Sequence, residues 1–137
     1  MSGNVVLAAD TIMVVETEVL VRTEVANYLR GCGYRVIEAA GSAEGVVLLE
    51  QREIQIDIVL TAVEIGGGMN GFALRRWVGE QRPEIEVILV GTPARAVDAA
   101  ADLCESGPAP RNRYDPQTIL DQIKRAVAGR SASRKSA

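Results

Sequence analysis

Histidine is absent from this 137-residue chain, and aromatic residues make up only 4% of it. Without histidine, the usual nitrogen ligand of zinc and the usual partner of a cysteine nucleophile are both missing. The low aromatic content argues against a surface on which the bases of single-stranded nucleic acid could stack. We therefore expect neither a zinc enzyme nor a nucleic-acid-binding protein.

Cysteine and long apolar runs are also scarce. Cys32 and Cys104 have no metal-ligand spacing, and we expect both to be reduced packing residues. The apolar stretch Val5 to Ala9 lacks a basic lead and is far shorter than the roughly 20 residues of a membrane-spanning helix. The sequence thus predicts no signal peptide and no membrane span, and a cytoplasmic location is expected.

Positive charge is sparse outside the last eight residues. The net charge is -3, but Arg130, Arg134 and Lys135 lie at the end, so residues 1–129 carry 12 basic against 18 acidic side chains, or -6. Such a body would repel a phosphate backbone. We predict an N-terminal extension (1–10), one domain with one core (11–129) and a disordered basic tail (130–137), with no room for an attached output domain.

Short apolar runs rich in β-branched residues predict strands that are buried on both faces, as in a parallel sheet. A more mixed stretch, Tyr34 to Ala39, predicts a strand near the sheet edge. The buried strands are expected at Ile12 to Val15, Ile58 to Leu60 and Val87 to Val90.

Helical patterns lie between these runs. The first has apolar residues at helical spacing from Val21 to Cys32 and is ended by Gly33. Ser42 and Asn70 are expected to cap the second and third helices, and a weaker fourth helix spans about Ala94 to Cys104. This alternation predicts a doubly wound α/β sheet with right-handed crossovers.

The end of the domain combines the weakest strand with a well-marked helix. Pro108 and Pro110 remove two backbone donors where a fifth strand should run, so that strand is expected to be irregular or at an edge. Asp115 and Pro116 then predict the start of the last helix, which Gly129 ends.

One set of segments follows a known order along the chain. It consists of Thr11 to Glu18, Asp57 to Glu64 and Gly68 to Phe72, with Gly31 to Tyr34 before the second strand and Tyr114 to Pro116 at the last helix. Over roughly residues 11–128 this order resembles the receiver domain of two-component response regulators. The resemblance implies a flavodoxin-like parallel sheet of strand order 2-1-3-4-5, with its site at the carboxyl ends of the strands.

The resemblance also implies a phosphorylation site whose central groups are replaced. In the family, two acidic residues after the first strand bind Mg²⁺; here they correspond to Glu16 and Thr17, so a hydroxyl replaces one carboxylate. The acceptor aspartate at the end of the third strand is both nucleophile and metal ligand, and it corresponds to Ala62. A methyl group can do neither job.

The remaining groups of the site are altered as well. The family's serine or threonine after the fourth strand corresponds to Gly91, with Thr92 one residue later, and its switch aromatic corresponds to Ala109. Its phosphate-binding lysine corresponds to Asn112. Because such groups act as a unit, we expect ordinary aspartyl phosphorylation to be lost and no Mg²⁺ cofactor to be required.

Glu16 and Glu64 leave an alternative open. Either could serve as a residual phosphoacceptor, or they could bind a divalent cation weakly together with Glu18. Glu64 can equally be a surface glutamate beside a loop. Gly66 to Gly68 lacks the lysine of a phosphate-binding loop and is interpreted as a flexible connection.

These observations predict a pseudo-receiver, not an enzyme, that acts in phosphorelay signalling through protein–protein interaction. The expected partner is a histidine kinase, a phosphotransfer protein or another regulator. It would dock on the face of the fourth helix, fifth strand and fifth helix, unless the chain competes with an active receiver for a kinase. A further alternative is a structural homodimer that uses Val5 to Ala9 and an exposed sheet edge.

Overall fold

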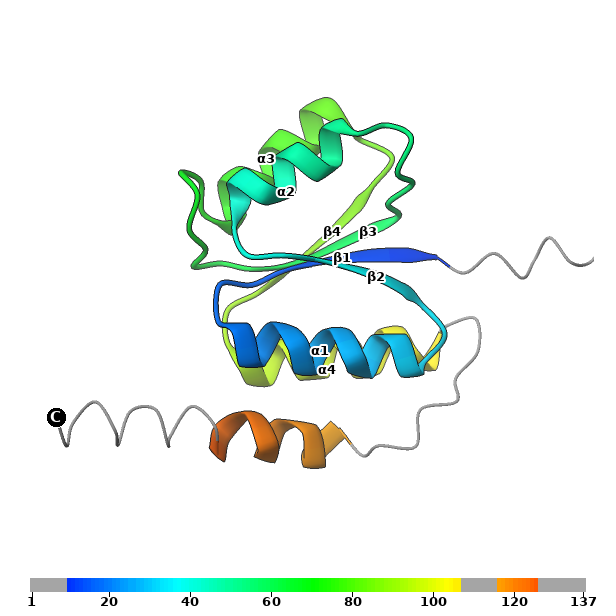
Figure 1. The fold of residues 1–137 in the computed structure, drawn as a ribbon, viewed down its shortest axis with the longest axis vertical. Helices are drawn as coiled ribbons and strands as arrows, with labels where there is room; N and C mark the ends of the chain where they lie inside the picture. Colours follow the sequence, from blue (N-terminus) through cyan, green and yellow to red (C-terminus); the bar gives the residue numbers. More distant parts are fainter. Residues whose placement is uncertain (1–9, 107–115, 126–137) are drawn as a thin grey trace, which may run out of the picture.

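The structure is a computed structural model and describes residues 10–106 and 116–125. In these residues four parallel strands form one sheet in the order β2-β1-β3-β4 (Figure 1). The strands are β1 (Thr11–Val15), β2 (Arg35–Ala39), β3 (Ile58–Ala62) and β4 (Glu86–Val90). The helices are α1 (Val19–Gly31), α2 (Ser42–Glu50), α3 (Gly71–Gln81) and α4 (Pro93–Glu105), with a further helix at 116–125.

This is the flavodoxin-like α/β fold that the resemblance implies, and the first four positions of the strand order are confirmed. The expected fifth strand, with Pro108 and Pro110, lies outside the described residues. So do Ala109, Asn112 and most of the predicted extension and tail. In the described part of the chain, no helix has the length and apolar character needed to cross a bilayer.

The core lies on both faces of the sheet because successive side chains of a strand point to opposite faces. All five residues of β1 are buried. Ile12 and Val14 join one apolar cluster, with the buried faces of α1 and α4, whereas Met13 and Val15 join a second, with α2 and α3. The unbroken apolar run in the sequence is therefore explained by two half-cores that share one central strand.

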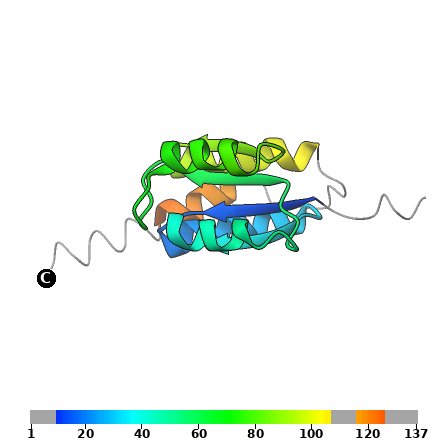
Figure 2. The same ribbon diagram turned by 90° about the horizontal axis from the view of Figure 1, so that it is seen from above.

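The fourth helix lies on an unexpected face. A right-handed crossover from β4 to a strand beside it would place α4 with α2 and α3. Instead, α4 packs beside α1 on the opposite face (Figure 1). Helix 116–125 lies beyond these two helices and, seen from above, falls between them, with Ile119 and Ile123 buried (Figure 2). In the described residues, α4 therefore does not lie on the face of α2 and α3, where a right-handed crossover into a fifth strand requires it.

The predicted helix caps have mixed outcomes. Asn70 caps α3 as expected, since its Oδ1 accepts a hydrogen bond from the Ala73 N–H at 2.9 Å. The prediction for Ser42 is wrong: Gly41 occupies the N-cap position of α2 and Ser42 is already helical. The Ser42 hydroxyl is instead bonded to the loop after β3, where it donates to the Gly66 carbonyl at 3.0 Å and accepts from the Met69 N–H at 3.1 Å.

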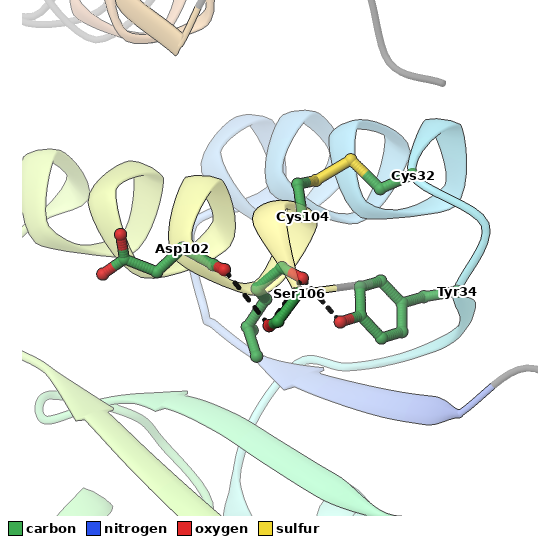
Figure 3. Close-up of a disulfide and its surroundings, with 6 residues drawn as sticks. Cys32, Tyr34, Asp102, Cys104 and Ser106 are labelled. Atoms are coloured by element: carbon green, nitrogen blue, oxygen red, sulfur yellow. Dashed lines mark hydrogen bonds between the residues drawn. A yellow bond between two sulfur atoms is a disulfide. The ribbon is translucent and has the colours of Figure 1, made fainter. Parts of the chain in front are cut away.

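The expectation of two reduced cysteines is also wrong in this structure, because Cys32 and Cys104 form a disulfide (Figure 3). Cys32 ends α1 and Cys104 lies in the last turn of α4, and their Cα atoms are 5.4 Å apart, within the range that a disulfide bridges. Both residues are buried. Their pairing depends on α4 lying against α1, which the spacing of the two cysteines does not reveal.

Candidate functional site at the carboxyl ends of the strands

A cavity of about 230 Å³ lies where β1, β3 and β4 end, which is the edge at which doubly wound sheets bind ligands. The strand ends and the loops that follow them supply most of its lining. The start of α1 and the start of α4 supply the rest. The lining residues are Glu16, Glu18, Val21, Ala62, Glu64, Val90, Gly91, Thr92 and Pro93.

Ala62 lies at the centre of this edge. It is the last residue of β3 and is paired with Val90 of β4, and its half-buried side chain offers only a methyl group to the cavity. The first turn of α3 packs directly against this point, because the Gly71 N–H donates to the Val63 carbonyl at 2.7 Å. A Cβ on Gly71 would collide with the Ala62 carbonyl oxygen and lie 2.8 Å from Cδ2 of Leu89. Glycine at this position lets α3 begin next to the end of β3.

Glu16 follows β1 and is half-buried. Its Oε2 accepts a hydrogen bond from the Glu18 N–H at 2.8 Å, and its backbone carbonyl accepts one from Nη1 of Arg22 at 2.8 Å. Burial raises the pKa of the Glu16 carboxyl above its ordinary value, and the nearby Glu18 carboxylate acts in the same direction, whereas the Glu18 N–H opposes them. The carboxylate thus already accepts a bond within its own loop.

Thr17 links three loops instead of capping α1. Its Oγ1 donates to the Ala40 carbonyl at 3.1 Å and accepts from the Gly66 N–H at 3.2 Å. The N-cap position of α1 is Glu18, which makes no side-chain capping bond. Thr17 therefore joins the loops that follow β1, β2 and β3, a role that its position in the sequence alone does not reveal.

The glycine loop is held in a defined conformation. Gly67 and Gly68 have φ angles of +98° and +100°, which favour glycine. The Gly66 carbonyl accepts bonds from both the backbone N–H and the hydroxyl of Ser42, at 2.7 and 3.0 Å. These bonds, together with the one that the Gly66 N–H donates to the Thr17 hydroxyl, fix the beginning of a loop for which the sequence predicts flexibility.

The structure brings most of the predicted site residues together. Glu16, Ala62, Glu64, Gly91 and Thr92 all line the cavity, and Thr17 lies in the adjoining loop. The Thr92 hydroxyl accepts a bond from the Arg95 N–H at 3.1 Å and so caps α4, while Glu64 is exposed. Asn112 lies outside the described residues.

Among the described residues, the oxygen donors at this edge are not grouped as a Mg²⁺ site requires. Mg²⁺ prefers near-octahedral coordination by oxygen, supplied in part by carboxylates. Ala62 provides no side-chain oxygen, and Oε2 of Glu16 is hydrogen-bonded to a backbone N–H. Over 10–106 and 116–125, no three Asp, Glu, Cys or His side chains are grouped to hold a metal ion.

The sequence matches the response regulator receiver domain family over residues 12–107. The chain belongs to this family. Its match covers β1 to α4, including the candidate site. None of the curated proteins matches this chain. Receiver domains are signalling modules of two-component systems that interact with proteins such as kinases or other regulators.

Solved receiver domains share the fold. A response regulator receiver domain protein from Clostridium thermocellum is 21% identical, with a TM-score of 0.57 over 90% of this chain and 98% of that chain. A CheY-like receiver domain protein from Methanospirillum hungatei JF-1 is 19% identical, with a TM-score of 0.58 over 92% and 99%. The signal receiver domain of an HD domain-containing protein from Pseudomonas fluorescens Pf-5 is 20% identical, with a TM-score of 0.57 over 94% of each chain.

Proposed function

We propose that this receiver domain does not accept a phosphoryl group and acts in two-component signalling by binding a protein partner in one constitutive conformation. The single observation that carries the proposal is Ala62 at the end of β3, where the resemblance implies the acceptor aspartate. A methyl group has no lone pair with which to attack phosphorus. It also supplies no oxygen to a metal ion.

The surroundings of Ala62 support the same proposal. The carboxylate of Glu16 and the hydroxyls of Thr17 and Thr92 each make a hydrogen bond to the backbone of the chain itself. Groups in this arrangement hold loops and cap helices. A phosphoryl group would need a fixed cation to stabilise its charge, and the described residues of the cavity lining offer carboxylates instead.

The proposed partner is a histidine kinase, a phosphotransfer protein or another regulator. The expected docking face includes a fifth strand outside the described residues, but α4 itself presents Arg95, Asp98 and Asp102 along a groove beside the end of β4. Exposed charges of both signs suit a polar, reversible contact. We therefore place the partner's contact on α4 and propose no requirement for Mg²⁺.

The proposal is tested by incubating the chain with acetyl phosphate and Mg²⁺ and measuring its intact mass. A receiver domain with an acceptor aspartate, treated in parallel, serves as the positive control. We expect the control to gain a phosphoryl group and this chain to gain none. Partner capture, with the chain as bait, should give the same partners with and without acetyl phosphate. Failure to recover any kinase, phosphotransfer protein or regulator would count against the protein-binding role.

A residual phosphoacceptor is the second candidate, because Glu16 and Glu64 both line the cavity beside Ala62. An acid-labile mass gain on the natural chain would favour it. Glu16→Gln and Glu64→Gln would then identify the acceptor, since only one of the two substitutions should abolish the gain. Ala62→Asp is a matched comparison, because it restores a carboxylate at the position of the acceptor. If this variant also gains no phosphoryl group, the groups that support phosphorylation are lost along with the nucleophile.

A further inference from the structure

The Cys32–Cys104 pair joins two helices at the end opposite the candidate cavity. α1 and α4 each contain 13 residues and lie side by side on one face of the sheet. Their first turns supply Val21 and Pro93 to the cavity, and the disulfide joins their other ends (Figure 3). A helix of this length spans about 20 Å. The disulfide therefore joins α1 and α4 at one end, and the other end of this helix pair borders the cavity.

A hydrogen bond and apolar contacts reinforce the same joint. The Tyr34 hydroxyl donates to the Leu103 carbonyl at 2.6 Å, next to the disulfide (Figure 3). Ala96, Val97 and Ala100 bury the inner face of α4 in the cluster that also contains Val21 of α1. α4 thus keeps non-covalent contacts when the disulfide is opened, so that cleavage would loosen the helix without unfolding the domain.

Cys104 is the more accessible of the two cysteines. Its residue is 7% exposed, against 0% for Cys32, and it is followed by the exposed Glu105 and Ser106 at the end of α4. A small dithiol can therefore reach this sulfur after local fraying of the last turn, which is the part of a helix that opens most easily.

We propose that Cys32–Cys104 is a reversible thiol–disulfide site through which a dithiol reductant loosens α4 from α1. A thiolate of the reductant attacks Sγ of Cys104, the S–S bond breaks, and Cys32 leaves as a thiolate that takes up a proton. The second thiol of the reductant then attacks the mixed disulfide, releases Cys104, which is protonated in turn, and closes the reductant's own disulfide. Two electrons and two protons pass to the cysteine pair.

The reverse reaction uses a low-molecular-weight disulfide as oxidant, which takes back the two electrons and two protons. The inference is independent of whether the candidate site around Ala62 accepts a phosphoryl group, because it concerns a different chemical input at the other end of α1 and α4. It predicts that the redox state of the surroundings changes the mobility of α4, on which we place the partner's contact.

The test uses the full chain without denaturant. Dithiothreitol should convert the pair to two alkylatable thiols, detected by intact mass after reaction with N-ethylmaleimide, and oxidised glutathione should restore the bond. Amide hydrogen exchange in α4 should become at least tenfold faster on reduction, while those amides of α3 that exchange through local opening keep their rates. In the double variant Cys32→Ser/Cys104→Ser, the amides of α4 should exchange at the rates of the reduced chain, and dithiothreitol should not change these rates.

Tyr34→Phe is the matched control, since it removes the neighbouring hydrogen bond but leaves both sulfurs. It should speed exchange in α4 while keeping the difference between the oxidised and reduced states. The proposal is overturned if the air-oxidised chain has two free thiols or if the bond persists in dithiothreitol under native conditions. Equal exchange of α4 in the two states would overturn it as well.

Discussion

Opening the Cys32–Cys104 disulfide should lower the free energy of unfolding by an amount that follows from the position of the two cysteines. They are 72 residues apart in sequence, so the bond closes a loop that includes most of the described fold. In the chain-entropy description, closing a loop of this size removes about 4 kcal/mol of conformational entropy from the unfolded state at 25 °C. The oxidised chain should be more stable than the reduced chain by about that amount.

Trp77 provides the assay. It is the only tryptophan in the chain, and it lies on α3, half-buried against the cluster that contains Met13. Its fluorescence therefore reports the packing of the domain from a face remote from the disulfide. With an unfolding slope of about 1.5–2 kcal/mol per molar urea, a loss of about 4 kcal/mol moves the midpoint down by roughly 2–3 M.

The comparison is made on one sequence, with and without reductant, so that no side chain is altered. The double variant Cys32→Ser/Cys104→Ser should unfold near the reduced chain in both buffers. Coincident midpoints for the oxidised and reduced chains would refute the reasoning, because they would show that the bond does not restrict the unfolded ensemble or does not form.

Three further substitutions test the candidate site and the helix that adjoins it. Gly71→Ala should lower the free energy of unfolding by about 1–3 kcal/mol, because the new Cβ collides with the end of β3. Gly79→Ala is the control, since it lies in the same helix with open space around it and should leave the free energy of unfolding unchanged or raise it. Urea unfolding measures both variants. Asn70→Ala should cost about 1 kcal/mol through loss of the α3 cap, measured in the same way. Burial raises the pKa of Glu16 in the folded state, so its ionisation destabilises the fold as the pH rises above roughly 4.3. Glu16→Gln should therefore raise the Tm at pH 7, with a gain that disappears below about pH 4.

The strands were predictable because their apolar, β-branched runs have one stable position, the interior of a parallel sheet. β1 and β3 match their predicted positions closely, since almost every residue in them is buried. Asn70 was predictable for a similar reason, because its capping bond is local. The position of Ser42 was not predictable, because it depends on a close approach of Gly41 to Gly66. A Cβ on Gly41 would lie 2.6 Å from the carbonyl oxygen of Gly66. This contact between two loops decides where α2 begins.

Features that depend on the arrangement of distant elements could not be predicted. The hydroxyl of Thr17 bonds to residues 23 and 49 positions away, and nothing in its local sequence distinguishes this from a helix cap. The disulfide required α4 to lie on the α1 face, whereas the predicted crossover placed it elsewhere. Site residues such as Ala62 were placed at the cavity because each directly follows or ends a strand.

The hydrogen bonds around the cavity explain how this edge of the sheet stays ordered. The resemblance implies that other receiver domains bind a phosphoryl group and a metal ion at the same edge. The Glu16 carboxylate accepts from the Glu18 N–H, the Thr17 hydroxyl bridges two loops, and the Thr92 hydroxyl caps α4. Each of these polar groups has a backbone partner, so none requires an ion to satisfy it. An aspartate at this half-buried position 62 would add a charge that these internal bonds leave without a partner, whereas alanine adds none. These internal bonds are the reason why we propose a conformation fixed by the sequence instead of one set by phosphate.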